Sequence, residues 1–449
     1  MIKQSTIRFL FQMIYFSNFW NTFIAQYYIN LSLYQEVNQI FFYLIMTILK
    51  IICPALSGFI IDHVQFTLNI LFIGQWLTIV SYIYFLANIL REIDDYLYFA
   101  IGFQILGQQL QIVIILTMIS KHFTESQIPL QITRFYQYDY GGRILCSMIF
   151  FIQAFNNKIE WLQYEKKVLI IISIIPFVIL LSLALCIYRS FPIFRLDIYK
   201  KIPELEKSPM GQQNNLLQVI KDLCKTEIIL IVIAASSVMS IIQIWQKQLL
   251  TKFYGYFNNI YHEQQSSTTI LFGFAIFEIP AFISIFVAER VGKKIKTNFD
   301  ALQYLNDATS NSLIYFILSA LQIACKHSMM GLQIFLLILT LIMQQQNLTI
   351  LSISSTILIG VKKNQRTFGV SFGMLSMFTN LFEIWVICVL SQLKVENTIL
   401  SIQKIAVIYG FAICYCILGA TLAKMLQFVN QIKIEQAPLS LQALELINN

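Results

Sequence analysis

The chain has 449 residues, of which 57% are hydrophobic and only 12% are charged. Ordinary globular proteins carry about 25% charged residues, so this composition excludes a soluble protein of this length, whose surface needs more charge. The net charge is +8. We attribute this excess to loop Lys and Arg residues that follow the positive-inside rule, and it does not indicate nucleic-acid binding.

Long apolar segments recur along the chain and predict transmembrane helices, which need about 20 apolar residues each. They lack the alternation of membrane β-strands, so we expect an all-α membrane protein. The predicted helices cover residues 9–30, 37–61, 68–88, 97–120, 135–155, 168–188, 228–249, 268–287, 312–325, 332–359, 368–393 and 402–427. The eight cysteines lie mostly inside these segments, without the spacing of a metal site or a disulfide framework.

A polar stretch at 189–227 divides the twelve predicted helices into two groups of six. We therefore predict an N-terminal six-helix lobe (1–190), a cytoplasmic central loop (191–226) and a C-terminal six-helix lobe (227–449). Most of the 31 Lys and Arg residues fall on the side that also holds both termini, which places the termini in the cytosol. This rule applies alike to the plasma membrane and to endomembranes.

Two similar segments follow corresponding helices of the two lobes. Segment 58–63 (GFIIDH) ends the second predicted helix, and segment 288–294 (AERVGKK) follows the eighth. In each, we expect the glycine to permit a tight turn, the acid (Asp62 or Glu289) to cap a neighbouring helix N-terminus, and basic residues such as Arg290 to stay at the inner headgroups. The segments resemble the loop signature of the major facilitator superfamily, although the first copy lacks the basic pair. Ordinary inner-face loops are the alternative interpretation.

Within that superfamily, the first half of the chain resembles the ferroportin (solute carrier) iron exporters. The similar stretches are 20–30, 58–62, 75–82, 116–123 and 138–139. The resemblance implies iron export, yet the acid and the His that bind metal in the family's first helix correspond here to Ser17 and Asn21, which are poor Fe²⁺ ligands. The Cys of the family's helix 7 and the His of its helix 11 have no counterpart, although Glu383 lies near the latter. The metal ligands therefore stay unassigned.

Few charged residues lie at bilayer depth, where an unpaired charge is costly. They are Lys50, Asp139, Arg143, Glu278 and Glu383. The superfamily resemblance implies that helix 5 faces helix 8 and that helix 2 faces helix 11. We therefore predict the interlobe pairs Arg143–Glu278 and Lys50–Glu383, which open and reform during transport. In the alternative interpretation, Asp139 and Arg143 pair locally on one helix and Lys50 snorkels to the interface.

Uncharged polar residues form stripes on predicted helices 1, 4, 7 and 10, the helices that line the cavity in this superfamily. We assign to the substrate pathway Asn18, Asn21, Gln104, Gln108, Gln111, Gln243, Gln246, Asn380 and Glu383. A further polar run, 344–347, interrupts helix 10. The alternative is that these residues only make interhelical hydrogen bonds, worth about 0.6 kcal/mol each.

The sequence lacks the phosphate-loop, dinucleotide-binding, nucleophile-elbow and zinc-protease motifs. We therefore expect no enzyme and no cofactor, and we expect transport to draw on gradients. The predicted function is secondary active transport by alternating access, with ferroportin-like export of iron or another divalent metal as the specific hypothesis. An organic solute such as an acetyl-CoA-like metabolite is the alternative substrate, and a non-transporting membrane scaffold is the alternative class. The expected partners are the lipid bilayer and a small solute or metal ion.

Overall fold

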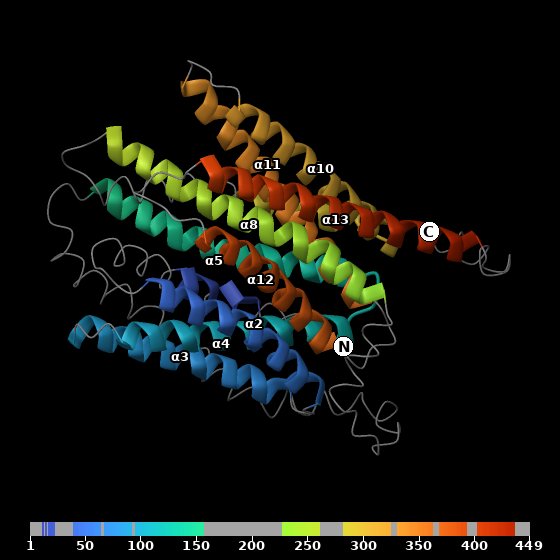
Figure 1. Ribbon diagram of the computed structural model, residues 1–449. Helices are drawn as coiled ribbons and strands as arrows, with labels where there is room; N and C mark the ends of the chain where they lie inside the picture. Colours follow the sequence, from blue (N-terminus) through green and yellow to red (C-terminus); the bar gives the residue numbers. More distant parts are fainter. Residues whose placement is uncertain are drawn as a thin grey trace.

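The computed structural model of the protein describes residues 11–12, 14–15, 17–22, 39–63, 67–91, 95–156, 227–260, 282–324, 330–361, 368–392 and 402–435. The regular structure in these ranges is helical throughout, without a strand. The labelled helices are α2 (Gln39–His63), α3 (Thr67–Arg91), α4 (Asp95–His122), α5 (Ile128–Asn156), α8 (Glu227–Ile260), α10 (Asn298–Ala324), α11 (Met330–Val361), α12 (Phe368–Gln392) and α13 (Ile402–Glu435) (Figure 1). Further helical residues lie at 11–12, 14–15, 17–22 and 282–294. The predicted all-α fold class is confirmed.

Several helix boundaries differ from the prediction, among them the ends of α8 (Ile260 rather than 249) and α13 (Glu435 rather than 427) and three described next. The segment predicted to end at 287 stays helical to Lys294, so the motif 288–294 lies on a helix and its glycine makes no tight turn. The short helix predicted at 312–325 begins at Asn298 instead. It begins there because Thr297 and Asp300 bond reciprocally, each side chain accepting from the other's backbone N–H (3.1 and 3.0 Å).

The third boundary is the start of α5, at Ile128 rather than 135, with Pro129 in its first turn. Proline fits there because its missing N–H has no partner to lose at the start of a helix. The helix predicted at 168–188 lies outside the described residues. Hydropathy located the apolar cores of the described spans, whereas local residues decided where α5 and α10 begin.

Helices of the same half pack closely. In the first half, α4 packs against α2 and α3; in the second, α8 packs against α11, α12 and α13, and α10 packs against α11 and α13. Gly107 shows how close the approach is, because a Cβ added there would lie 2.6 Å from the Gly74 carbonyl oxygen of α3. Small residues permit such packing in membranes, where no hydrophobic effect drives apolar helices together.

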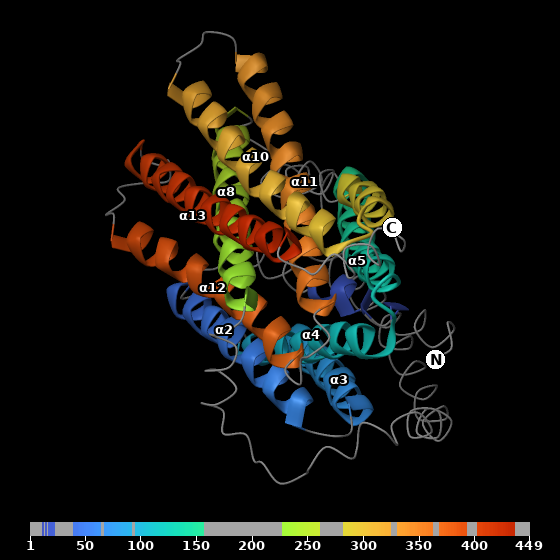
Figure 2. The ribbon, with the colours of Figure 1, turned by 90° about the vertical axis from the view of Figure 1, so that its right-hand side faces the viewer.

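The halves also meet each other. α2 runs along α12, α4 also contacts α12, and α5 contacts α11. The helix 282–294 lies beside α5, as Figure 2 shows where its yellow ribbon meets the teal one. The expectation that predicted helix 2 (α2) faces predicted helix 11 (α12) is therefore confirmed. For predicted helices 5 and 8, the described end of the latter lies beside α5.

Four of the described helices contain stretches long and apolar enough to cross a membrane by length and composition, namely Tyr98–Lys121, Glu227–Gln246, Phe368–Leu390 and Ala406–Gln431. Many large apolar side chains point outward, among them Phe286 and Trp385, which are 59% and 60% exposed. Such an apolar exterior suits a hydrocarbon solvent. These features indicate an integral, multi-pass membrane protein.

Candidate functional site

The halves make contact where α2 and α4 end and α12 begins, which we call the Asp62 end of the bundle. Gly58 of α2 and Gly369 of α12 touch backbone to backbone, since a Cβ added at Gly369 would lie 2.6 Å from the Gly58 carbonyl oxygen. One turn further, a Cβ on Gly373 would overlap the Pro54 carbonyl. We call this contact of Pro54, Gly58 and Asp62 with Gly369, Val370 and Gly373 the α2–α12 interface.

The carboxylate of Asp62 closes this interface. Its Oδ1 accepts a hydrogen bond from the Gly369 N–H (3.0 Å), and its Oδ2 accepts one from the Val370 N–H (2.8 Å). These N–H groups belong to the first turn of α12, where they have no partner within the helix. The negative charge also favours the positive end of the α12 dipole. Asp62 is thus an N-terminal cap supplied from the other half of the molecule.

Polar contacts continue along α2 and α12 toward the middle of the bundle. The Asn380 amide donates to the Lys50 carbonyl oxygen (3.1 Å), and the Ser376 hydroxyl donates to Gln109 Oε1 of α4 (3.4 Å). Glu383, one turn beyond Asn380, is buried. Lys50 and Glu383 therefore lie about one helical turn apart along the contact between α2 and α12. Their predicted ion pair stays a prediction.

A second contact, the α5 interface, joins Thr133 and Tyr136 of α5 to Gly292, Ser352 and Thr356. A Cβ added at Gly292 would overlap the Thr133 side chain. The Tyr136 hydroxyl lies 2.9 Å from the Thr356 hydroxyl and donates to the Ser352 carbonyl oxygen at 3.3 Å. Nearby, a Cβ on Gly360 of α11 would lie 2.8 Å from Ser120 Oγ. Both interfaces therefore close the same end of the bundle.

The other predicted interlobe charges lie differently. Glu289 pairs with Lys293 of its own helix at 2.6 Å, with the two side chains 51% and 69% exposed. Arg290 is exposed as well. Among the described residues Glu289 therefore caps no neighbouring helix, in contrast to Asp62. Asp139 accepts a bond from the Asn18 side chain through its backbone carbonyl. Glu278, the predicted partner of Arg143, lies outside the described residues.

The polar stripe of α4 divides between two environments. Gln104 donates to the Ser17 carbonyl oxygen (3.1 Å) and Gln111 donates to the Thr78 hydroxyl (3.2 Å), and both glutamines are fully buried inside the first half. Gln108 is half-buried and donates to Asn18 Oδ1 (3.2 Å). Gln104 and Gln111 thus make hydrogen bonds between helices, as in the alternative interpretation of the polar stripes. The Gln108 side chain, in contrast, stays partly accessible.

The second half shows the same division. Gln344 is buried and donates to the Ser312 carbonyl oxygen (3.1 Å). Gln246 is half-buried and donates to Gln345 Oε1 (2.9 Å). Asn21 and Gln243 are half-buried, and neither has a hydrogen-bond partner among the residues that the structure describes. These two amides are therefore the predicted pathway residues most available to a bound solute.

The described ranges contain no group of three His, Cys, Asp or Glu residues that could hold a metal ion. Sequence reasoning missed the glycines of α12 as contact residues. The signal was present, because Gly369 and Gly373 are four residues apart and form the small-xxx-small pattern of close helix contacts. It also missed Tyr136 and Gln109, for which the sequence held no distinguishing signal.

No family model and no curated protein sequence matches the chain. Its fold, however, is similar to many solved structures. The E. coli fucose:proton symporter has a TM-score of 0.62 and 13% identity, covering 94% of this chain and 98% of that one. A proton:xylose symporter gives 0.63 and 12%, covering 93% and 95%. An outward-facing bacterial homologue of ferroportin gives 0.60 and 11%, covering 93% and 98%. The chain therefore has the fold of the major facilitator superfamily transporters.

Proposed function

We propose that this protein is a secondary active transporter that moves a small polar solute by alternating access. The observation that carries the proposal is the closure of the Asp62 end by two interfaces between the halves. In alternating access, one half rocks against the other around a fixed site, and the contacts that close one end must break before that end opens. The proposed moving bodies are residues 1–190 and 227–449, joined by 191–226.

The positive-inside rule makes the Asp62 end cytoplasmic in this proposal, with both termini on the same side. The state described here is then closed toward the cytosol. The Asp62 cap and the Tyr136 contacts are the bonds that opening would break. Gradients supply the driving force, as for the proton symporters with which the fold is shared.

The proposed substrate is an uncharged, hydroxyl-rich solute. Among the predicted pathway residues, the half-buried ones are amides: Asn21, Gln108, Gln243, Gln246 and Asn380. Amides offer both donors and acceptors and suit a neutral polar ligand, whereas transition metals prefer imidazole, thiolate or carboxylate. The names of two similar structures, a fucose and a xylose symporter, support the same class.

Ferroportin-like export of iron or another divalent metal is the second candidate. It is favoured by the resemblance of 20–30 to the ferroportin family and by the similar fold of a bacterial ferroportin homologue. Ser17 and Asn21 stand where that family has its metal ligands, and a metal would have to be held there by neutral oxygens. The geometry therefore ranks this candidate below a neutral solute.

Uptake into proteoliposomes containing the purified full-length protein tests the proposal, with fucose, xylose, Fe²⁺ and Co²⁺ as probes. The variants are Asn21→Ala and Gln243→Ala, and Gln431→Ala, an exposed amide on α13, is the matched control. Losing one hydrogen bond to the solute costs about 0.5–1.5 kcal/mol, so we expect uptake to fall about 2- to 10-fold in each variant and to stay unchanged in the control.

Saturable sugar uptake that depends on Asn21 and Gln243 supports the proposal. Saturable uptake of Fe²⁺ or Co²⁺ without sugar uptake would move the assignment to metal transport. If folded protein takes up none of the four probes, counterflow with organic metabolites such as acetyl-CoA is the next assay. Failure there as well leaves the scaffold alternative and contradicts the transporter.

A further inference from the structure

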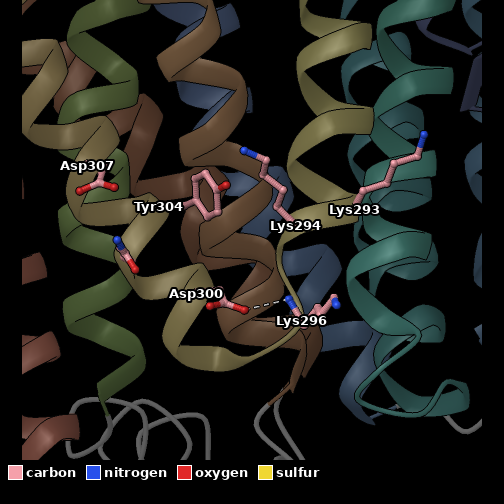
Figure 3. A pocket seen from close by; sticks show the side chains of 7 residues that line it. Lys293, Lys294, Lys296, Asp300, Tyr304 and Asp307 are labelled. Carbon is pink, nitrogen blue, oxygen red and sulfur yellow. Dashed lines mark hydrogen bonds between the residues drawn. The ribbon is translucent and has the colours of Figure 1, made fainter. Parts of the chain in front are cut away.

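A pocket that the proposed transport cycle does not use opens at the Asp62 end of the second half. It lies between the last turn of helix 282–294 and the first turns of α10 and has a volume of about 580 Å³ (Figure 3). Its lining side chains are nearly all charged or polar: Lys293, Lys294, Lys296, Asp300, Gln303, Tyr304 and Asp307. The connection between the two helices, residues 295–297, is short enough to hold them together at this point.

Two of the three lysine side chains that line the pocket lack a partner within the described ranges. Lys293 is paired with Glu289. The Asp300 carboxylate is occupied by the helix cap, accepting from the backbone N–H groups of Lys296 and Thr297 at 3.0 Å each. In contrast, the ammonium groups of Lys294 and Lys296 have neither an ion-pair nor a hydrogen-bond partner in the described part of the chain. Two cations thus remain available to an anion.

A hydroxyl group accompanies these cations. Figure 3 shows the Lys294 side chain pointing toward Tyr304, with Lys296 beside Asp300 below it. The phenol is protonated at neutral pH and can donate a hydrogen bond. Desolvation by burial raises the pKa of Tyr304 further above its usual value of 10.0. Two ammonium groups and one phenol form a donor set suited to a phosphate.

The pocket lies at the end of two outward-facing apolar stripes. Phe286 is seven residues before Lys293 and therefore on the same face of its helix, 59% exposed. On α10, Ile314 is seven residues after Asp307, again on the same face, and is 52% exposed. Phe282, Leu318 and Leu321 extend these stripes and are exposed as well. A molecule with a polar head and long apolar chains fits this arrangement.

We propose that the pocket binds the phosphate headgroup of an anionic phospholipid, with the acyl chains lying along Phe286 and Ile314. Lys294 and Lys296 pair with the phosphate, and the Tyr304 hydroxyl donates to it. Basic pockets between helices at the cytoplasmic membrane surface bind such headgroups. The carboxylate of Asp307 also lines the pocket. Its negative charge repels the phosphate and lowers the affinity of the pocket for the lipid.

Native mass spectrometry of the full-length protein tests this inference. The protein is released from mixed micelles of phosphatidylcholine and phosphatidylglycerol, and retained lipid is counted as the phosphatidylglycerol fraction is varied. Wild type should retain phosphatidylglycerol preferentially. Each lysine near the headgroups contributes about 1 kcal/mol, so Lys294→Gln with Lys296→Gln should weaken retention about 30-fold. The matched control is Lys121→Gln with Lys424→Gln, two exposed lysines outside the pocket.

A second variant distinguishes the chemistry of the ligand. Asp307→Asn should strengthen phosphatidylglycerol retention several-fold, because it removes the carboxylate that faces the anion. If Asp307→Asn instead weakens retention while phosphatidylethanolamine is bound well, the pocket recognises an amine and the proposal is wrong.

Competition with inorganic phosphate and with glycerophosphoglycerol distinguishes a lipid headgroup from a soluble phosphate as the ligand of the pocket. Neither should displace the lipid at equal concentration, because neither supplies acyl chains for the apolar stripes. Displacement by either would assign the pocket to a soluble phosphate. Equal retention by the lysine double variant and by wild type would overturn the site. Because retention is read without flux, these outcomes do not depend on the transport assay.

Discussion

The two interfaces that close the Asp62 end are built differently. In the α2–α12 interface, the backbones of Gly58 and Gly369 touch and a carboxylate caps the facing helix. In the α5 interface, Gly292 meets the side chain of Thr133, and neutral hydroxyls make the hydrogen bonds. Backbone atoms cannot move aside without moving a helix, whereas a side chain can be exchanged or can rotate. The first interface is therefore the less tolerant of the two.

The same difference separates the two motif copies. Segment 58–63 lacks the basic pair, and its acid and its glycine both contact the other half. Segment 288–294 keeps the basic residues, but its acid, Glu289, forms an exposed pair with Lys293 of the same helix. Its glycine, Gly292, contacts Thr133 of the other half. Two segments of similar sequence thus hold the halves by different means, and substitutions can separate those means.

The largest effect is expected from Gly58→Ala. The added methyl group would meet the Gly369 backbone, and overpacking of this kind costs about 1–3 kcal/mol, or about 5- to 150-fold in the population of the closed state. Spin labels on cysteines introduced at Lys121 and Lys424, exposed on opposite halves, measure the separation at this end. We expect the longer-distance population to grow. Gly410→Ala is the control, because a Cβ there has no atom within 4 Å.

Gly292→Ala should open the same end less, and a second substitution should relieve it. The added methyl overlaps the Thr133 side chain, so Thr133→Ala removes two of the three atoms that it meets. We expect the double variant to regain most of the closed population, by the same spin-label distances. No single side-chain truncation should relieve Gly58→Ala. If Thr133→Ala relieves both variants equally, the proposed difference between the interfaces is wrong.

Removal of the cap should have an intermediate effect. Loss of an N-terminal cap costs about 0.5–2 kcal/mol, so Asp62→Ala should lower the closed population about 2- to 30-fold. The matched variant Glu289→Ala removes only an exposed pair, worth about 0–1 kcal/mol. Proteoliposome flux and spin-label distances measured side by side should show a clear change for Asp62 and little for Glu289. The reverse order would mean that the second motif copy, not the first, closes the end.

The smallest effect is expected from Tyr136→Phe. This change removes the hydroxyl that bonds Thr356 and Ser352 and leaves the ring in place. Hydrogen bonds between membrane helices average about 0.6 kcal/mol, so we expect a change of about 2- to 3-fold in the closed population. Trp245→Phe, which loses a hydrogen bond to Tyr409 inside the second half, is the control for a lost bond that does not join the halves. A larger change in the closed population for the control would mean that the Tyr136 hydrogen bonds do not hold the halves together.

Much of the fold could be predicted from the sequence. Nine of the twelve predicted helices fall on described helices. The helices predicted at 9–30 and 268–287 are described only in part, and 168–188 lies outside the described residues. The prediction worked because a helix satisfies its backbone hydrogen bonds within the segment, and the cost of placing the segment in hydrocarbon then depends on its own side chains. Helix ends were less accurate, since α10 begins at a capping pair and the motif 288–294 extends its helix.

The candidate site was predictable only in part. The sequence marked Asp62 as a capping acid but could not identify α12 as the helix that it caps, because that helix begins 306 residues later. It placed Gln104, Gln108 and Gln111 on one stripe, yet only Gln108 stays accessible. The rotation of α4 about its axis decides which of its glutamines are buried. The sequence specifies this rotation weakly, because lipid and neighbouring helices are equally apolar.

By itself, the sequence determined that this protein is a bundle of membrane helices, and roughly where each apolar segment lies, because burial in lipid is a property of each segment alone. The tertiary structure decided which glycines meet backbone and which meet side chain, which acid joins the halves, and that three lysines surround one pocket. The glycine contacts and the cap depend on how helices distant in sequence pack against each other, and close packing is set by shape at the point of contact. The pocket depends on how two consecutive helices meet at the connection 295–297.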